Sequence, residues 1–290
     1  MSAARCPGPG PNALTPEPAR PPARPRVAQS AAERWLATAE VVGTSIRAQW
    51  ADMRTSPLAY LLGVVQPLVF LLVTLAPQTD PPAAEGTRAA FGVLLTAFWG
   101  STVWSAAGIL RRERTQGTLA RTLAGVRDPR LVILGKSFGS SLVAVSLVTA
   151  TVGGTLALLR QPVRLDGGGW LLLGLLLVVL SGTGAGLLVG SLFVLSRHGP
   201  QLSSALMYPV YLLGGMLIPL ALVPDWLDWL SWGISLRWLQ QYLVAAAGGR
   251  PDLAALAAAA ALTAGYAIAG AWLFRRITDL ARRQATVELY

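Results

Sequence analysis

The chain has 290 residues, of which 53% are hydrophobic and only 13% charged, about half the charged fraction of an ordinary water-soluble domain. Its formal net charge of +10 would suit a nucleic-acid partner, but nearly all the arginines flank apolar runs instead of following one soluble face. We therefore predict an all-α polytopic membrane protein that binds no nucleic acid.

Residues 1–30 form a proline-rich start to the chain, with scattered arginines and the only cysteine, Cys6. A segment with so few apolar residues cannot form a packed core, so we expect a disordered cytoplasmic tail. The alternative is a proline-rich docking segment, which would need a repeated motif that this stretch lacks. One cysteine allows no internal disulfide.

A helix is predicted over residues 31–54, where apolar residues recur at spacings of three and four. Tryptophan on the apolar side and arginine on the other favour an amphipathic helix that lies at the membrane interface. The alternative is a helix packed against the rest of the bundle. The apolar stripe consists of Trp35, Ala39, Val42, Ile46, Trp50 and Met53.

Six apolar runs without Asp, Glu, His, Lys or Arg predict six transmembrane helices, since a span needs about 20 apolar residues. The first contains Pro67, which predicts a kink that neighbouring helices tolerate. The tryptophan-rich segment 225–242 predicts short helices at the outer face. The runs are 58–76, 89–110, 137–159, 170–195, 201–223 and 253–274.

Glycines at four-residue spacing in the fourth run let another helix backbone come close. They are Gly182, Gly186 and Gly190. We expect them to mark a tight helix contact, within the chain or across a dimer.

The most charged segment, Leu110 to Gly135, fixes the orientation. With this hairpin and both termini in the cytoplasm, 19 of the 24 lysines and arginines are inside and 5 outside, as the positive-inside rule requires. Residues 277–290 then form a basic cytoplasmic tail. The uncharged spans disfavour a channel or secondary carrier, where buried ionisable groups are expected.

No motif for chemistry stands out. His198, the only histidine, has no second ligand nearby, so we expect no metal site, and the missing HExxH motif and aspartate pairs disfavour a membrane enzyme. The segment Gly135-Lys136-Ser137 imitates the end of a phosphate-binding loop, but Arg130 stands where that loop needs glycine. We therefore expect no cofactor on this chain.

The hairpin resembles the cytoplasmic loop of ABC transporter permeases of the type 2 exporter family. The likeness lies in Arg112-Glu113-Arg114 through Gly117-Thr118-Leu119, then Pro129 and Leu134-Gly135-Lys136 before the third span. The chain departs from the usual pattern of this family in two places. Ala120-Arg121 stands where an acid usually follows Gly-Thr-Leu, which affects the surface that meets the partner. Ile234-Ser235-Leu236 lacks the proline that is often found there, which affects the outer face.

The resemblance implies a six-span domain over residues 31–276 in a bacterial plasma membrane. It would work as a homo- or heterodimer with a separate ABC ATP-binding subunit, which holds the ATP and Mg²⁺. Export of a hydrophobic or lipid-linked small molecule, such as a drug or antibiotic, is implied; the alternative is lipid or polysaccharide export. The implied ATPase-coupling residues are Arg112, Glu113, Gly117, Thr118 and Leu119.

Two features of the hairpin support coupling from the residues alone, whereas the alternative is a loop whose arginines only hold it on the inner side of the membrane. Glu113 is expected near the start of a short helix, whose positive end favours an acid, and Gly117 would let a partner backbone come close. A substrate path is expected along apolar and aromatic residues, although packing or lipid-facing roles are the alternative. These residues are Phe98, Trp99, Trp104, Met207, Tyr208 and Tyr211.

Overall fold

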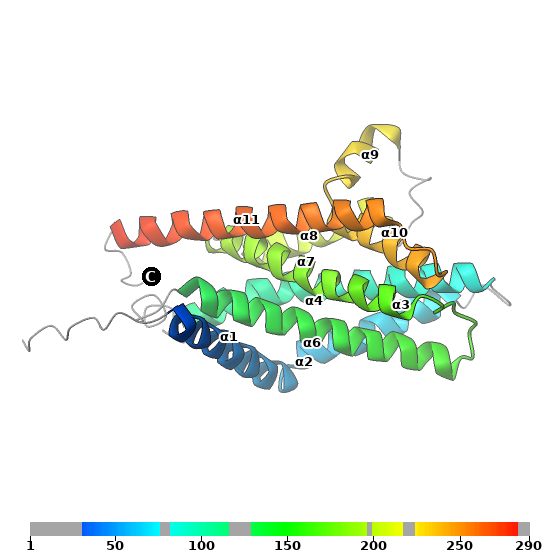
Figure 1. The fold of residues 1–290 in the computed structure, drawn as a ribbon, viewed down its shortest axis with the longest axis horizontal. Helices are drawn as coiled ribbons and strands as arrows, with labels where there is room; N and C mark the ends of the chain where they lie inside the picture. The colour runs from blue at the N-terminus through cyan, green and yellow to red at the C-terminus, as the bar shows by residue number, and fades with distance from the viewer. Residues whose placement is uncertain (1–30, 76–81, 116–128, 196–198, 217–223, 284–290) are drawn as a thin grey trace, which may run out of the picture.

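The computed structural model describes residues 31–75, 82–115, 129–195, 199–216 and 224–283, and within these ranges every regular element is a helix. Figure 1 shows four long helices side by side along the long axis of the molecule. These are α4 (Ala83–Thr115), α6 (Pro129–Leu158), α7 (Gly168–Leu195) and α11 (Leu253–Arg283). The all-helical prediction is confirmed for this part of the chain.

Shorter elements surround these four helices. Before them lie α1 (Ala31–Arg54), α2 (Pro57–Tyr60), the π-helix η1 (Leu61–Val65) and α3 (Gln66–Leu75). Between α7 and α11 lie α8 (Gly199–Leu213), α9 (Asp225–Ser231) and α10 (Ser235–Ala247). Figure 1 shows α9 standing away from the bundle, whereas α10 packs against α7, α11 and α4.

Four helices in the described part of the chain are long and apolar enough to cross a membrane: Pro57–Leu75, Leu131–Leu158, Gly168–Phe193 and Leu253–Ile277. They match the predicted first, third, fourth and sixth spans. The second lies within α4, which continues past Leu110 to Thr115. The chain is thus a multi-pass membrane protein, and the count of six stays a prediction.

The predicted fifth span, 201–223, is not one continuous helix. Helix α8 has 15 residues and ends at Leu213, short of the length that a bilayer requires. The chain then turns at Gly215, which has a φ of 68°, a conformation that glycine adopts at low cost. Residues 217–223 lie outside the described ranges.

The predicted tail 277–290 also begins inside a helix, because α11 continues to Arg283.

The largest helix contact, between α7 and α11, depends on glycines. A Cβ atom at Gly270 would lie 2.8 Å from the backbone nitrogen of Leu188, and one at Gly184 would lie 3.1 Å from the carbonyl oxygen of Thr263. Because each glycine faces the other helix's backbone, the two helices pack closely. Neither glycine belongs to the predicted Gly182, Gly186, Gly190 series.

Pro67 explains why the first span contains a π-helix. Proline has no N–H, so the carbonyl of Gly63 loses its donor four residues later. The chain widens into η1 over this turn, and the Thr151 hydroxyl on α6 lies 3.1 Å from the Gly63 oxygen and 2.9 Å from the Leu147 oxygen of its own helix, so it shares its proton between them. A neighbouring helix therefore replaces part of the missing bond, as expected for proline in a membrane helix.

Replacing Thr151 by valine is expected to destabilise the fold by about 0.6 kcal/mol, the average measured for side-chain hydrogen bonds between membrane helices, and by no more than about 1.7 kcal/mol. Thr149 on the same helix has a buried hydroxyl with no hydrogen-bond partner in the described structure, so Thr149→Val is the matched control and should not destabilise. Unfolding of the purified chain in a detergent titration measures both. Equal midpoints for the two variants would contradict the role assigned to Thr151.

Helix α1 packs along the first half of α6. A Cβ atom at Gly135 would lie 2.9 Å from Ser45 Cβ, and one at Gly139 would lie 3.0 Å from Ile46 Cα. The face of α1 that is buried consists of Ser45, Gln49 and Met53. The structure therefore supports the alternative of a helix packed against the bundle; Trp50 is 47% exposed on another face, where contact with lipid headgroups stays a prediction.

Candidate functional site

The predicted coupling residues fall at the end of α4 and beyond it. Arg112 and Glu113 lie in the last turn of α4, whereas Gly117, Thr118 and Leu119 lie outside the described residues. Glu113 is thus at the end of a long helix, and the short helix predicted after it falls on residues 116–128, outside the described residues. An acid is unfavourable at the negative end of a helix dipole, so α4 itself does not stabilise Glu113.

Both helices that flank the hairpin run directly into the bundle. Pro129 is the first residue of α6, a position that suits proline because the N–H there needs no partner. Gly135, Lys136 and Ser137 lie inside α6, where Gly135 contacts α1. The hairpin is therefore joined to α4 on one side and, through α6, to α1 on the other.

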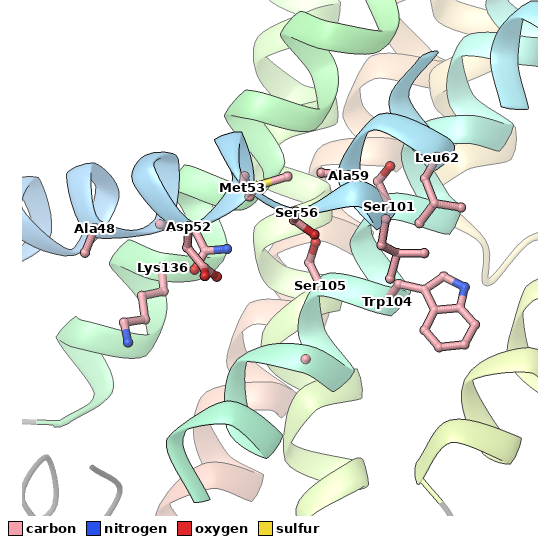
Figure 2. Close-up of a pocket in the computed structure, with 13 residues that line it drawn as sticks. Ala48, Asp52, Met53, Ser56, Ala59, Leu62, Ser101, Trp104, Ser105 and Lys136 are labelled. Atoms are coloured by element: carbon pink, nitrogen blue, oxygen red, sulfur yellow. The ribbon is translucent and has the colours of Figure 1, made fainter. Parts of the chain in front are cut away.

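A cleft of about 240 Å³ lies between α1, α2, α4 and α6. Figure 2 shows Asp52 and Lys136 at one end of it and Trp104 and Leu62 at the other. Serine side chains from α4 and from the start of the first span line it as well. They are Ser56, Ser101 and Ser105.

The cleft has a buried floor and an exposed rim. Gln49 and Ser101 on its floor are 7% and 5% exposed, whereas Leu58 on its rim is 39% exposed. Asp52 is also exposed at the rim. The cleft therefore combines buried hydrogen-bonding groups with an exposed rim.

The predicted path residues do not gather along one wall. Trp104 lines the cleft, whereas Phe98 and Trp99 are buried in the core and Tyr208 is exposed. Tyr208 meets Tyr211 edge to face, with ring centroids 6.4 Å apart.

Met207 and Tyr211 do come together, on the α8 side of α4. A Cβ atom at Gly100 would lie 2.8 Å from the Tyr211 hydroxyl, 3.3 Å from Met207 Cε and 3.5 Å from Gln66 Oε1. The Tyr211 hydroxyl and Gln66 Oε1 are both buried and lie next to each other, so the hydroxyl can donate to the amide oxygen. These two polar groups therefore connect α8 with α3 inside the bundle.

The predicted packing glycines lie in the core of the bundle. A Cβ atom at Gly182 would collide with the ring of Phe98 and lie 2.9 Å from Ser141 Oγ. Gly182 and Gly186 border a small cavity that hydroxyl groups of α4 and α6 line, and Gly190 is buried farther along α7. The lining hydroxyls belong to Thr102, Ser105, Ser137, Ser140 and Ser141.

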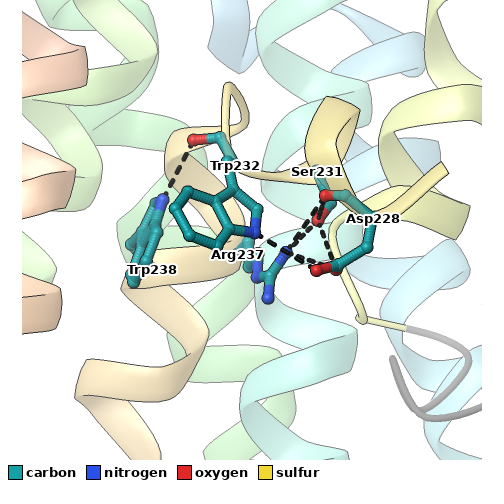
Figure 3. A network of polar contacts seen from close by, with 5 residues as sticks. All are labelled: Asp228, Ser231, Trp232, Arg237 and Trp238. Carbon is teal, nitrogen blue, oxygen red and sulfur yellow. Dashed lines mark hydrogen bonds and ion pairs between the residues drawn. The ribbon is translucent and has the colours of Figure 1, made fainter. Parts of the chain in front are cut away.

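The tryptophan-rich segment forms two short helices, α9 and α10, that a polar network joins (Figure 3). Arg237 on α10 pairs with Asp228 on α9 at 2.7 Å, and the Trp232 indole donates to the same carboxylate at 3.2 Å. The indole, with further hydrogen bonds from Ser231 and Arg237, lowers the pKa of Asp228 below its ordinary value. Trp226 and Trp229 are each 71% exposed, so α9 presents an aromatic surface.

The last long helix begins with a side-chain cap. Asp252 accepts hydrogen bonds from the backbone N–H groups of Ala254 and Ala255, both at 3.0 Å, and from Gln241 of α10 at 2.7 Å. The Ala255 bond, followed by the Gln241 bond, lowers the pKa of the Asp252 carboxyl. The cap therefore fixes both the start of α11 and its position beside α10.

Replacing Asp252 by alanine is expected to destabilise the fold by about 1 kcal/mol, because the α11 cap is lost. The carboxylate caps the helix when it is ionised, and its pKa is lowered from 3.8. The parent should therefore be more stable than the variant above pH 3.8, and this difference in stability should be lost as the pH falls through the lowered pKa. Unfolding midpoints at several pH values measure this. A difference that persists at low pH would contradict the role of the charged cap.

The sequence analysis did not predict the cleft, although the positions of some polar residues indicated it. Ser101 and Ser105 stand four residues apart in an otherwise apolar run, a spacing that places both hydroxyls on one helix face. Asp52 near the end of the amphipathic helix was a second sign. The partner elements α1 and α6 are distant in sequence, so spacing alone could not show that they meet α4.

Comparison with known families supports the assignment from the hairpin. The family model described as ABC-2 type transporter matches residues 40–247, from within α1 to the end of α10. The match includes the hairpin, the cleft and the tryptophan-rich segment. Domains of this family are membrane components of ABC transporters and generally work with an ATP-binding subunit. No curated protein matches the chain.

Proposed function

Because the chain belongs to the ABC-2 type transporter family, we propose that it is the permease subunit of an ATP-driven exporter. Its substrate is a hydrophobic or amphipathic small molecule, and its energy comes from a separate ATPase subunit. That subunit docks on the basic hairpin around Glu113 and Gly117. Two permease copies complete the transporter, as the resemblance implies.

The observation that carries this proposal is the continuity between the hairpin and the cleft. Arg112 and Glu113 lie on the same unbroken helix as Ser101, Trp104 and Ser105, which line the cleft. Rigid helices transmit displacement from one site to another. A partner that moves the hairpin would therefore shift one wall of the cleft relative to α1.

On its other side, the hairpin is connected to the cleft and to α1 through α6. Lys136 lines the cleft, and Gly135 and Gly139 hold α6 against α1. Near the same end, Ile133 of α6 packs with Leu187 of α7 and Phe274 of α11. Movement of the hairpin would thus reach three long helices.

The charges of the bundle support a cytoplasmic hairpin. Arg47, Arg54, Arg275 and Arg276 are exposed on α1 and near the end of α11, and Arg276 lies over the Trp272 ring, 5.2 Å from its centroid. An arginine beside a tryptophan is typical of the membrane boundary. An ATPase subunit in the cytoplasm would meet this basic end.

Inverted membrane vesicles test the proposal, because the cytoplasmic face is then outside and accessible to added ATP. Vesicles that contain this chain and an ABC ATPase that co-purifies with it should accumulate a fluorescent hydrophobic dye when ATP is added. Vesicles with either protein alone should not. ATP-independent accumulation driven by an ion gradient would overturn the proposal in favour of a secondary carrier.

A further inference from the structure

We propose that the end of α11 binds the phosphate group of an anionic phospholipid in the cytoplasmic leaflet. Arg275 and Arg276 contact the phosphate, and the exposed side chains of Trp272 and Ile268 contact one acyl chain. The assignment to this leaflet rests on the proposed function, which places the hairpin in the cytoplasm. The binding chemistry rests on the surface of α11 itself.

Both arginines lie at one end of a membrane span, on the same side of the bundle as the hairpin. The apolar, membrane-length part of α11 is Leu253–Ile277, which includes them. Phe274, the residue before them, packs with Ile133 near the start of α6. Figure 1 shows the red end of α11 on the same side of the bundle as the start of α1. Charged groups at the end of a span lie at the depth of the lipid headgroups.

The side chain of Arg276 is directed toward the lipid layer and not toward the cytoplasm. Side chains of an α-helix tilt toward its N-terminus, and from this end of α11 the N-terminal direction leads into the membrane. The guanidinium accordingly lies over the ring of Trp272, one turn closer to the membrane centre, at 5.2 Å from the ring centroid. A cation at this depth is stabilised by an anion at the same depth, and the lipid phosphate is the anion found there.

The two arginines have hydrogen-bond donors to offer a phosphate. A guanidinium carries five N–H donors, and the contact with one aromatic ring does not occupy all of them. Arg275 and Arg276 are both exposed, and neither forms an ion pair with an acid in the part of the chain that the structure describes. Guanidinium groups bind phosphate oxygens through pairs of parallel N–H bonds.

An exposed apolar surface continues from the arginines toward the membrane centre. Trp272 and Ile268 precede Arg276 by four and eight residues, so the three side chains lie on one face of α11. Trp272 is 57% exposed and Ile268 is 71% exposed. At 1.5 Å per residue this face extends roughly 12 Å from Arg276, which is most of the ~15 Å hydrocarbon depth of one leaflet. A lipid with its phosphate at the arginines therefore has an apolar surface along which one acyl chain lies.

The charge of this surface selects an anionic lipid. Each arginine beside an anionic membrane surface raises the affinity about fivefold. Two arginines should therefore favour an anionic head over a zwitterionic head by about 25-fold. An ATPase subunit fits this surface less well, because Trp272 and Ile268 lie within the membrane span.

Native mass spectrometry of the purified full chain tests the site. The chain is kept in detergent micelles with added phosphatidylglycerol or phosphatidylcholine of the same acyl chains, and the peaks with and without lipid give dissociation constants. Phosphatidylglycerol should bind about 25-fold more tightly than phosphatidylcholine. Glycerol 3-phosphate, which has the phosphate but no acyl chain, should not displace it at equal concentration.

A matched set of variants separates this site from the general positive charge of the cytoplasmic end. Arg275→Gln and Arg276→Gln should each weaken phosphatidylglycerol binding about fivefold, and together about 25-fold. Arg47→Gln on α1 is the control, since Arg47 is also exposed but donates to the Gly43 carbonyl of its own helix at 3.4 Å. It should leave the binding unchanged.

Equal affinity for the two lipids, or equal affinity of Arg276→Gln and Arg47→Gln for phosphatidylglycerol, would overturn the site. Displacement of the lipid by glycerol 3-phosphate would also overturn it, because the acyl chain would then contribute nothing. Loss of the ATPase subunit from the double variant, with phosphatidylglycerol binding unchanged, would assign the surface to that subunit and contradict the proposal.

The lipid measurement needs neither ATP nor an ATPase subunit. Absence of selective lipid binding with ATP-driven transport intact would therefore overturn this site alone. Selective binding that depends on Arg275 and Arg276, without any ATP-driven transport, would overturn the proposed function alone.

Discussion

Replacing Gly270 by alanine is expected to destabilise the chain by about 1 to 3 kcal/mol, the cost of overpacking a well-packed core. The added Cβ atom would lie 2.8 Å from the Leu188 nitrogen and 3.1 Å from the Leu187 carbonyl carbon. Both are backbone atoms, so no rotation of a side chain relieves the contact. Helix α11 must move away from α7, which weakens the largest helix contact of the fold. Unfolding of the purified chain in a detergent titration measures the effect.

Gly265 provides the matched control on the same helix. A Cβ atom at this position meets nothing within 4 Å, so Gly265→Ala should stabilise the chain by up to about 1 kcal/mol through helix propensity. The two substitutions are chemically identical and differ only in their surroundings. If Gly270→Ala were as stable as Gly265→Ala, the close packing of α7 on α11 would be wrong.

Replacing Glu113 by glutamine is expected to weaken co-purification with the ATPase subunit by about 30-fold, the effect of losing an interface residue worth 2 kcal/mol. The stability of the chain without its partner should not fall. Because Glu113 lies at the negative end of α4, removal of its charge should leave the stability of the chain unchanged or raise it by about 0.3 to 1 kcal/mol. Weaker binding with no loss of stability would identify Glu113 as a residue that contacts the ATPase subunit and does not stabilise the permease itself. Gly117→Leu should weaken binding as well, by keeping the partner backbone away.

Glu85→Gln is the control for Glu113→Gln, since it is the same substitution in the first turn of the same helix. Pull-down of the tagged permease from membranes that contain both proteins gives the ratio of the two subunits. Glu85→Gln should retain the parental ratio. Unchanged ratios for both Glu113→Gln and Gly117→Leu would contradict docking on the hairpin.

Local patterns in the sequence predicted the helices well, because each depends on neighbouring residues. The spacing of apolar residues gave α1 its bounds of Ala31 and Arg54, and the length of the apolar runs identified four of the membrane-length helices. Pro67 correctly indicated a distortion of the first span, although its form, a π-helix closed by Thr151, depends on a residue of α6.

Contacts between distant helices were harder to predict. Helix α7 is apolar on every side, so its pattern does not show which face meets which neighbour. Gly182 faces Phe98 of α4, whereas Gly184 faces α11. The four-residue spacing in the sequence indicated Gly182 but not Gly184. The predicted path residues do not line one wall for a related reason, since large aromatic side chains in a membrane helix also serve packing.

The stripe on α1 illustrates the same limit. The sequence indicated an apolar side that includes Trp50 and Met53, but the structure exposes Trp50 and buries Ser45 and Gln49 together with Met53. Small and polar residues fit there because Gly135 and Gly139 bring α6 close. A hydropathy pattern assigns polar residues to water and therefore misses a buried contact between small residues.

The sidedness of the hairpin is the claim on which coupling to an ATPase depends, and cysteine labelling in intact cells tests it directly. Replacing Cys6, the only cysteine, by serine gives a background into which Thr118→Cys is introduced. Leu165→Cys, between α6 and α7 and 62% exposed, is the control for the outer face. A membrane-impermeant maleimide should label Leu165→Cys in intact cells and Thr118→Cys only after the cells are permeabilised. Labelling of Thr118→Cys in intact cells would place the hairpin outside and contradict the account.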